Sequence, residues 1–172
     1  MWRLDNTAFD RRHVNSSVKC RNQMMLWGCI SFNGQGVLVD VNGRIDSQKY
    51  VDVISDNLQL SAHMMGLGDD FVFQHDNAPV HTSRLTLSFL AEQGIVVMGW
   101  PAQSPDINPI EHLWAILKKK VKAEQRRKQQ TFREAVIKAW SELPLSLIQT
   151  LIDSIPDRLR AVIESKGYAT KY

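Results

Sequence analysis

Two acidic residues in this sequence have the chemistry and the setting of metal ligands. Asp76 follows the largely apolar segment 71–75, at the carboxyl end of an expected strand, where open α/β sheets place their ligand sites. Glu111 lies in the first turn of an expected helix, and 34 residues separate the two acids. Carboxylates from separate elements are the hard oxygen ligands that two-metal phosphoryl transfer needs, with Mg²⁺ or Mn²⁺ ions ~4 Å apart. Together, Asp76 and Glu111 predict a two-metal site.

Each acid also has a structural interpretation that the sequence leaves open. Asp76 can cap the bend at 77–79 with its side chain, as aspartates in turns often do. At the helix start, Asn108 as N-cap, Pro109 and Glu111 form a variant of the capping box. These interpretations explain each acid singly, whereas the pairing of the two acids favours a metal site.

The helix that contains Glu111 leads into the most basic segment of the chain. Residues 118–128 contain seven Lys and Arg against one Glu. Lys118 and Lys122 follow Glu111 at i+7 and i+11, nearly in line with it on the helix and off its apolar stripe. Such a stripe is either a solvated helix face or a phosphate-contacting surface. The residues that we expect to contact DNA are Lys118, Lys119, Lys122, Arg126 and Arg127.

Hydrophobic patterning predicts the elements that position these residues. Apolar runs at 24–31 and 36–41, with Asn33-Gly34 between them, predict a hairpin, and 2–4 an earlier strand. Further strands are expected at 71–76 and 95–98. Helices are expected to begin near Asp46 or Ser47, Thr82 or Ser83, Pro109, Thr131, Pro144 and Pro156. This order predicts one α/β domain over 1–172, a mixed sheet flanked by helices, with a helical tail over about 131–172.

The composition is that of an ordinary soluble globular protein. The chain has 172 residues, of which 44% are hydrophobic and 23% charged, which disfavours disorder. No apolar run approaches the ~20 residues that a membrane span requires, so no membrane partner is expected. The net charge of +3 is only mildly basic. The two cysteines, Cys20 and Cys29, indicate a reduced, intracellular compartment and match no common zinc pattern.

Three segments resemble the catalytic core of Tc1/mariner-type DDE transposases, in particular of the Tc1-like branch. They are MLWGCISFNGQG, FVFQHDNAPVHTS and WPAQSPDINPIEHLWAILKKKV, and the closing PDRLRAVIESKGYATKY resembles that branch's C-terminal helix. In this resemblance Asp76 matches the second acidic residue of the family and Glu111 the third, at the spacing typical of the branch.

The resemblance implies an RNase H-like fold that cuts transposon ends and joins them to target DNA with two Mg²⁺ or Mn²⁺ ions. Asp76 and Glu111 would be catalytic and would hold the metals. Five other residues of the motifs would line or shape the site, namely His75, Asn77, His81, Asn108 and His112. The resemblance also implies DNA as a partner, through transposon ends and target, and a location in the nucleus, and it allows a homodimer.

The sequence also departs from the family pattern. The family's first acidic residue lies on a central strand before the segment that corresponds to 24–31, and a paired helix-turn-helix region precedes that strand. We find no counterpart of either, so we expect an N-terminally truncated catalytic domain with impaired strand cleavage and strand transfer. Asp5, Asp10 and Asp40 fall on or beside other expected strands, which disfavours them as substitutes for the first ligand.

Two other functions stay open. A non-catalytic DNA-binding or interaction protein derived from a transposase would use the basic segment 118–128 without a metal site. An RNase H-like nuclease acting on its own would need a third ligand from a residue such as Asp40. We also expect marginal stability, re-pairing of strands or rescue by a partner chain, because removing a central strand exposes unpaired backbone groups.

Overall fold

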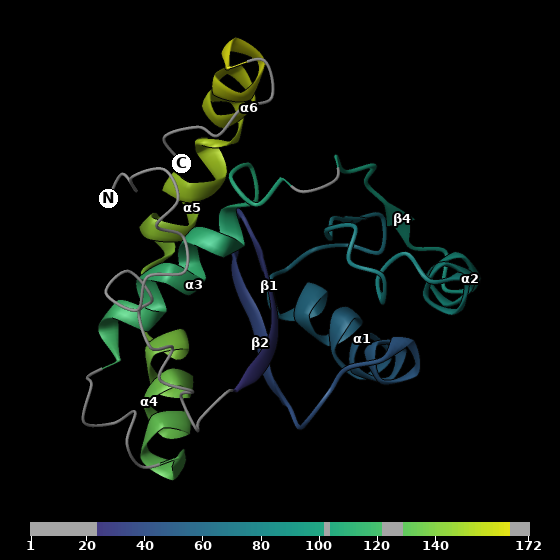
Figure 1. The fold of residues 1–172 in the computed structure, drawn as a ribbon, viewed down its shortest axis with the longest axis horizontal. Helices are drawn as coiled ribbons and strands as arrows, with labels where there is room; N and C mark the ends of the chain where they lie inside the picture. Colours follow the sequence, from purple (N-terminus) through teal and green to yellow (C-terminus); the bar gives the residue numbers. More distant parts are fainter. Residues whose placement is uncertain (1–23, 102–103, 122–128, 166–172) are drawn as a thin grey trace, which may run out of the picture.

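A β-hairpin lies in the middle of the molecule, with one group of helices on either side (Figure 1). The structure is a computed structural model that describes residues 24–101, 104–121 and 129–165, with the side chains of 129–131 left aside. The hairpin joins β1 (Met25–Ser31) to β2 (Gly34–Val41) in antiparallel register, with Trp27 opposite Val39. Gly34 ends the turn at φ 139°, a conformation that glycine adopts readily. The expected hairpin is confirmed.

Four helices lie on one side of the hairpin, and the last of them extends beyond it (Figure 1). They are α3 (Pro109–Lys120), α4 (Gln129–Ser141), α5 (Leu145–Asp153) and α6 (Ile155–Glu164). Leu113, Leu117, Trp140 and Ile148 form the centre of their core, against which Ile30 and Leu38 of the hairpin pack. The helices begin within two residues of the expected positions, and α3 ends at Lys120 rather than continuing through the basic segment.

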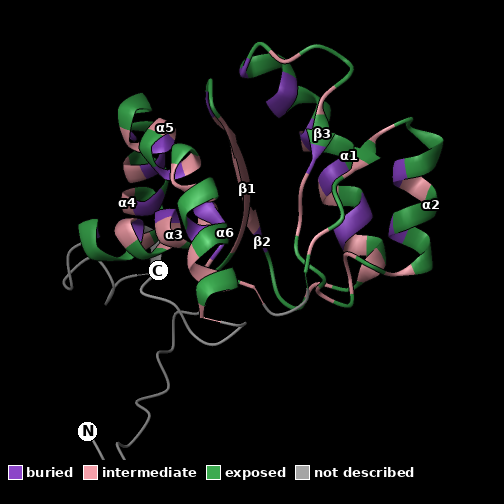
Figure 2. Cartoon of the chain, turned by 90° about the horizontal axis from the view of Figure 1, so that it is seen from above, coloured by how far each residue is buried: buried purple, intermediate pink, exposed green. Residues whose placement is uncertain are grey.

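The other side of the hairpin carries a smaller group of elements with its own core. It contains α1 (Ser47–Met64), β3 (Val72–Phe73), α2 (Arg84–Glu92) and β4 (Val96–Val97). The centre of this core consists of Tyr50, Ile54, Leu58, Phe73 and Leu90. Asp46 caps α1 by accepting from Lys49 N, and Ser83 caps α2 by accepting from Thr86 N. Figure 2 shows the buried faces of these helices on both sides of the hairpin.

The described strands form two separate pairs rather than one continuous sheet. β1 and β2 are antiparallel, whereas β3 and β4 are parallel, with Val72 opposite Val96. Both orientations of the expected mixed sheet are therefore present, but β1 and β3 are not hydrogen-bonded to each other. β3 is also shorter than the expected strand over 71–76, because only two of its residues find a ladder partner. The expected strand at 2–4 lies outside the described residues.

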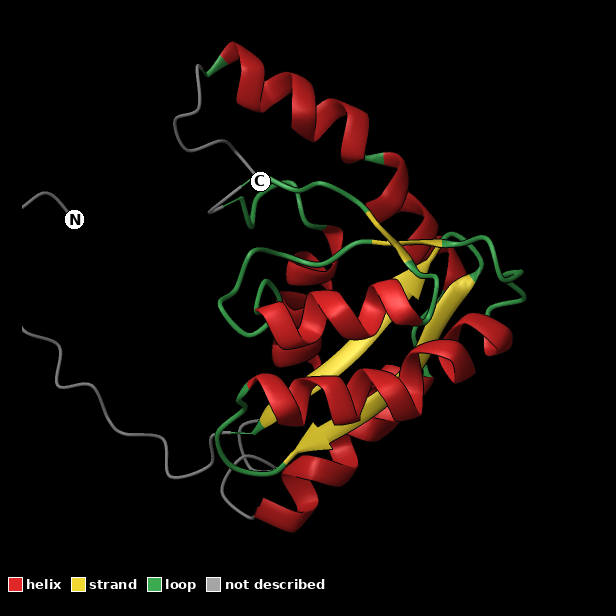
Figure 3. Cartoon of the chain, turned by 90° about the vertical axis from the view of Figure 1, so that its right-hand side faces the viewer, coloured by secondary structure: helices red, strands yellow, loops and turns green. Residues whose placement is uncertain are grey.

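Gly36 on β2 brings the two groups of helices close to the same point of the hairpin. Its carbonyl accepts a hydrogen bond from Trp140 Nε1 on α4 at 2.9 Å. The next residue, Val37, donates its backbone N–H to Ser61 Oγ on α1 at 3.1 Å. A Cβ atom at position 36 would lie 2.5 Å from Cβ of Ser61, so no side chain fits there without movement. Figure 3 shows the two strands running between helices from both groups. None of the described helices is long and apolar enough to cross a membrane.

Candidate functional site

Asp76 lies just beyond β3, on a loop that its own carboxylate helps to shape. Its side chain is 52% exposed. Oδ1 accepts the backbone N–H of Ala78 at 3.0 Å and lies 2.6 Å from Nδ1 of His81. The contact with Ala78 is the turn-capping role that the sequence left open. Both contacts use Oδ1, so turn capping and ligand binding through the second oxygen are compatible.

The rings of Tyr50, His75 and His81 form a cluster beside this loop. The Tyr50 hydroxyl and Nδ1 of His75 form a hydrogen bond at 3.1 Å. The rings of His75 and His81 stack with centroids 5.1 Å apart, and the Tyr50 ring lies 4.2 Å from that of His81. Burial and then the neighbouring His81 lower the pKa of His75 to about 4, against the opposing charge of Asp76. His75 is therefore neutral at pH 7, and burial, the main cause of the raised pKa of Tyr50, keeps its hydroxyl protonated.

Tyr50 is a member of this cluster that the sequence analysis did not single out. Nothing local in the sequence distinguishes it, because its partner His75 is 25 residues away. Asn77, in contrast, turns to another loop and donates to the carbonyl of Trp100 at 2.6 Å. It links the loop after β3 to the loop after β4, which is a shaping role rather than a ligand role.

Glu111 lies in the first turn of α3, where the helix dipole favours negative charge. Oδ1 of Asn108 accepts from Ile110 N at 3.4 Å, so Asn108 is the expected N-cap. In a complete capping box the Glu111 side chain would accept the backbone N–H of Asn108. Here that N–H donates instead to the carbonyl of Pro105 at 3.2 Å. The Glu111 carboxylate is exposed and is not needed as the acceptor for that group.

His112 does not line the cavity that holds both carboxylates and belongs to a partly buried polar contact. Its Nδ1 lies 3.0 Å from Nη1 of Arg158 on α6, whose side chain is only 2% exposed. Desolvation and the Arg158 charge both lower the pKa of His112. The sequence analysis did not single out Arg158.

One cavity of about 620 Å³ brings the two acids together. Asp76 and Glu111 both line it, together with residues of β1 and β3. The other expected site residues that line it are His75, His81 and Asn108, whereas Asn77 and His112 do not. Its wall also includes Gln74, whose buried Nε2 has no hydrogen-bond partner among the described residues.

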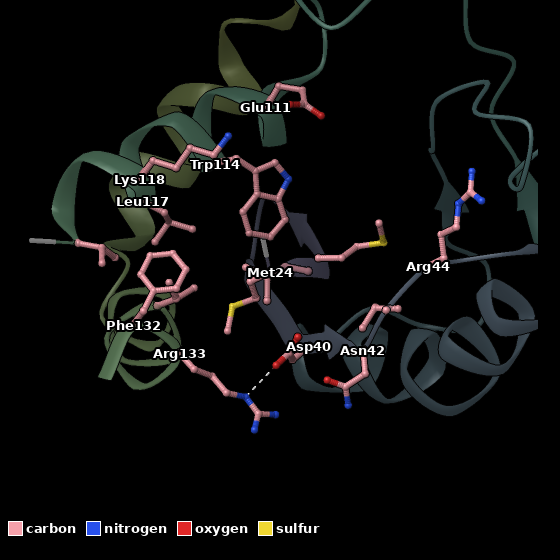
Figure 4. Close-up of a pocket in the computed structure, with 16 residues that line it drawn as sticks. Met24, Asp40, Asn42, Arg44, Glu111, Trp114, Leu117, Lys118, Phe132 and Arg133 are labelled. Atoms are coloured by element: carbon pink, nitrogen blue, oxygen red, sulfur yellow. Dashed lines mark ion pairs between the residues drawn. The ribbon is translucent and has the colours of Figure 1, made fainter. Parts of the chain in front are cut away.

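A second cavity of about 900 Å³ adjoins Glu111 on the side of α4 (Figure 4). Lys118 borders it from α3, and Arg44 borders it from the segment between β2 and α1. Asp40 also lines this cavity, where its Oδ2 forms an ion pair with Nε of Arg133 at 2.9 Å. Asp40 is not among the residues around the cavity that holds Asp76, which argues against it as a third ligand beside both acids.

The expected DNA-contacting residues are only partly within the described chain. Lys118 and Lys119 are exposed in the last turn of α3, next to Lys120. Lys122, Arg126 and Arg127 lie outside the described residues, as do Asp5 and Asp10. Among the described residues, no group of three or more His, Cys, Asp or Glu side chains is placed to hold one metal ion.

Comparison with known proteins gives the same family for most of the chain. Residues 7–133 match the model of the DDE superfamily endonuclease family. The Tcb1 transposase of Caenorhabditis briggsae is 37% identical over 182 residues, covering 100% of this chain and 66% of the relative. The Tc1 transposase of Caenorhabditis elegans is 37% identical over 178 residues, covering 98% and 65%. The chain thus spans slightly less than two thirds of the length of these relatives.

Solved structures show the same fold at low sequence identity. The Mos1 transposase catalytic domain with raltegravir and Mg superposes with a TM-score of 0.75 and 21% identity, covering 86% of this chain and 77% of that chain. A Mos1 mariner paired-end complex with Mn gives a TM-score of 0.78 and 18% identity, covering 86% and 45%. The RNase H-like α/β fold expected from the sequence is confirmed. Sequence and fold together show that this chain belongs to the DDE superfamily endonucleases and is a relative of the Tc1-type transposases.

Proposed function

We propose that this chain is the catalytic core of a DNA transposase that cuts transposon ends and joins them to target DNA. The observation that carries the proposal is the shared cavity, because Asp76 and Glu111 reach it from separate elements. Its relatives are transposases, and the Mos1 structures with the same fold include paired-end complexes with transposon ends. Its DNA substrate would place this activity in the nucleus.

The donor set around the cavity fits Mg²⁺ or Mn²⁺. Both acids offer carboxylate oxygens, which these ions prefer over imidazole and thiolate. Nδ1 of each cavity imidazole has a partner, which is the Tyr50 hydroxyl for His75 and Asp76 for His81. Mos1 structures with the same fold hold Mg or Mn. Two divalent ions would activate the attacking hydroxyl and stabilise the leaving oxygen.

The residues of this chain divide the remaining tasks. His81 and the Ala78 N–H orient the Asp76 carboxylate through Oδ1 and leave Oδ2 for a metal. The N-terminus of α3 stabilises the charge of Glu111. Farther along the same helix, the exposed Lys118 and Lys119 would neutralise backbone phosphates of the DNA.

A third acidic ligand would come from outside the described residues. The cavity is lined by every residue from 25 to 32 and from 71 to 76. Alternate residues of a strand point to opposite faces, so a cavity that is lined by every residue lies at the edge of the strand. The backbone groups of such an edge can pair with another strand. We propose that a further strand carrying the third carboxylate pairs there. Without that strand in place, Asp76 and Glu111 alone would bind metal weakly and support little DNA cleavage.

Metal binding tests the proposal without requiring full activity. Mn²⁺ is titrated into the 172-residue chain, and the free ion is measured by its electron paramagnetic resonance signal. Asp76→Asn and Glu111→Gln should each weaken binding by about tenfold or more, since each removes a charged ligand. The matched controls are Asp56→Asn on α1 and Glu92→Gln on α2, both exposed and away from the cavity, which should bind as the original chain does. Binding that is unchanged by Asp76→Asn and Glu111→Gln would contradict the proposal.

A non-catalytic DNA-binding function is the second candidate, and the exposed lysines at the end of α3 favour it. Plasmid nicking in Mn²⁺ and DNA binding in EDTA separate the two functions. Nicking that is lost in Asp76→Asn supports the transposase core. DNA binding that falls steeply with salt, ignores EDTA and comes without any nicking supports the second function.

A further inference from the structure

The most deeply buried charged side chain among the described residues is Arg158 on α6. It is 2% exposed. Burying a guanidinium is costly unless its N–H groups find acceptors. Nε donates to Ser154 Oγ at 2.7 Å, and Nη1 donates to the Asp106 carbonyl at 2.7 Å. Nη1 also lies 3.0 Å from Nδ1 of His112. These contacts fix the position of the guanidinium relative to Ser154, Asp106 and His112.

The partners of Arg158 lie on both sides of the N-cap of α3. Asp106 precedes Asn108 by two positions, and His112 directly follows Glu111. They are 52 and 46 residues from Arg158 in sequence, so a distant helix fixes this segment. A guanidinium only donates, so Nδ1 of His112 must accept, which sets the orientation of that ring.

The segment before α3 is also held by burial. Ile107 is 1% exposed and Asn108 is 8% exposed. Buried residues therefore fix the direction of the first turn of α3, and the position of Glu111 follows from that turn. The Glu111 carboxylate itself is exposed at the cavity, and its own side chain is not what holds the turn.

We propose that Arg158 is a positioning residue that fixes the first turn of α3 and thereby directs the Glu111 carboxylate into the cavity shared with Asp76. The inference rests on the proposed function, in which Glu111 is a metal ligand. Arg158 contacts neither metal nor DNA in this role. It acts through the Asp106 carbonyl and the His112 ring.

Arg158→Lys is the decisive variant, because it keeps the charge but lacks the fork that reaches several acceptors at once. Arg158→Lys should lower Mn²⁺ affinity by about tenfold, as loss of a supporting contact commonly does. The same substitution in the Glu111→Gln background should change Mn²⁺ affinity little, because the residue it positions is gone. In the Asp76→Asn background the effect should persist.

Ile148→Val on α5 controls for stability. Ile148 is fully buried in the core beneath α3 and does not line the cavity, so this change destabilises the protein without touching the Arg158 contacts. An equal loss of Mn²⁺ affinity in Ile148→Val and Arg158→Lys at matched melting temperature would overturn the proposal. So would an Arg158→Lys effect that is undiminished in the Glu111→Gln background.

Hydrogen exchange keeps this test separate from the proposed function. If Glu111→Gln leaves Mn²⁺ binding unchanged, the proposed function fails, and the exchange rates of the amides at 110–113 then decide the positioning role. Arg158→Lys should raise these rates relative to amides of α2, whereas equal changes in both helices overturn the proposal. Should Arg158→Lys not fold, Ser154→Ala removes one acceptor and keeps the guanidinium. A smaller rise at 110–113 is expected for it, and no rise overturns the proposal.

Discussion

The two acids of the candidate site are held in different ways. Asp76 sits on an exposed loop after a two-residue strand and is oriented by local polar contacts within five residues of sequence. Glu111 sits on a twelve-residue helix whose opposite face, including Leu113 and Leu117, lies in a core built by α3, α4 and α5. The comparison teaches that local contacts orient the Asp76 carboxylate, whereas long-range packing positions the helix that carries Glu111.

The largest expected effect concerns the two cores. Leu113→Ala removes a fully buried side chain beneath Glu111 and should lower the free energy of unfolding by about 2–5 kcal/mol. Leu90→Ala makes the matching change on the Asp76 side, where Leu90 is 1% exposed. Urea unfolding with Mn²⁺ titration at low urea checks the comparison. Leu113→Ala should weaken Mn²⁺ binding through Glu111, and equal weakening by Leu90→Ala would show that the position of Asp76 depends on core packing as much as that of Glu111 does.

A smaller effect is expected from pH, and it belongs to the Asp76 side. The pKa of His75 is about 4 in the folded protein, against 6.5 for an ordinary histidine. Protonation therefore favours the unfolded chain, so this contribution to stability is complete above pH 6.5 and is lost as the pH falls towards 4. The loss is smaller than the roughly 3 kcal/mol that the shift alone corresponds to, because His75 is only partly buried and solvent screens its charge.

Urea midpoints between pH 7 and 4.5 measure this contribution. His75→Gln should flatten the pH dependence, whereas His63→Gln, an exposed histidine near the end of α1, should leave it as it is. A pH dependence that stays the same in His75→Gln would mean that the ring cluster does not hold His75 in its neutral form.

The smallest effects come from the helix caps, which exist on both sides. Ser83→Ala removes the cap of α2, and Asn108→Ala removes the cap of α3. Each should cost about 1 kcal/mol of unfolding free energy, measured by thermal melting. Only Asn108→Ala should also weaken Mn²⁺ binding, because only α3 carries a proposed ligand in its first turn. Equal Mn²⁺ affinity in the two variants would contradict the difference between the two sides.

The sequence allows prediction of the elements better than of their pairing. Caps and turns are local signals, so Asp46, Ser83 and Asn108 could be named as cap candidates and the hairpin could be placed from its turn residues. The length of β3 could not be predicted, because pairing depends on which strand lies beside it. The separation of the strands into two pairs has the same cause.

The same difference between local and long-range signals applies to the candidate site. Asp76 and Glu111 could be picked out because their motifs are local, and the structure places both at one cavity. Their assignment as metal ligands stays a prediction. The contact of Tyr50 with His75 and that of Arg158 with His112 could not be foreseen, since each joins residues that are distant in sequence and ordinary in their local pattern.

Gly36 gives the hairpin a further consequence. Its carbonyl is bound by Trp140 on α4, and its missing side chain lets Ser61 on α1 approach the strand closely. At this point only the backbone of β2 separates α4 from α1. A methyl group there would act as a spacer, moving α1, and with it Tyr50 and the Asp76 loop, outward from α3. The gap between the two carboxylates therefore depends in part on the absence of a side chain at a position that does not line their cavity.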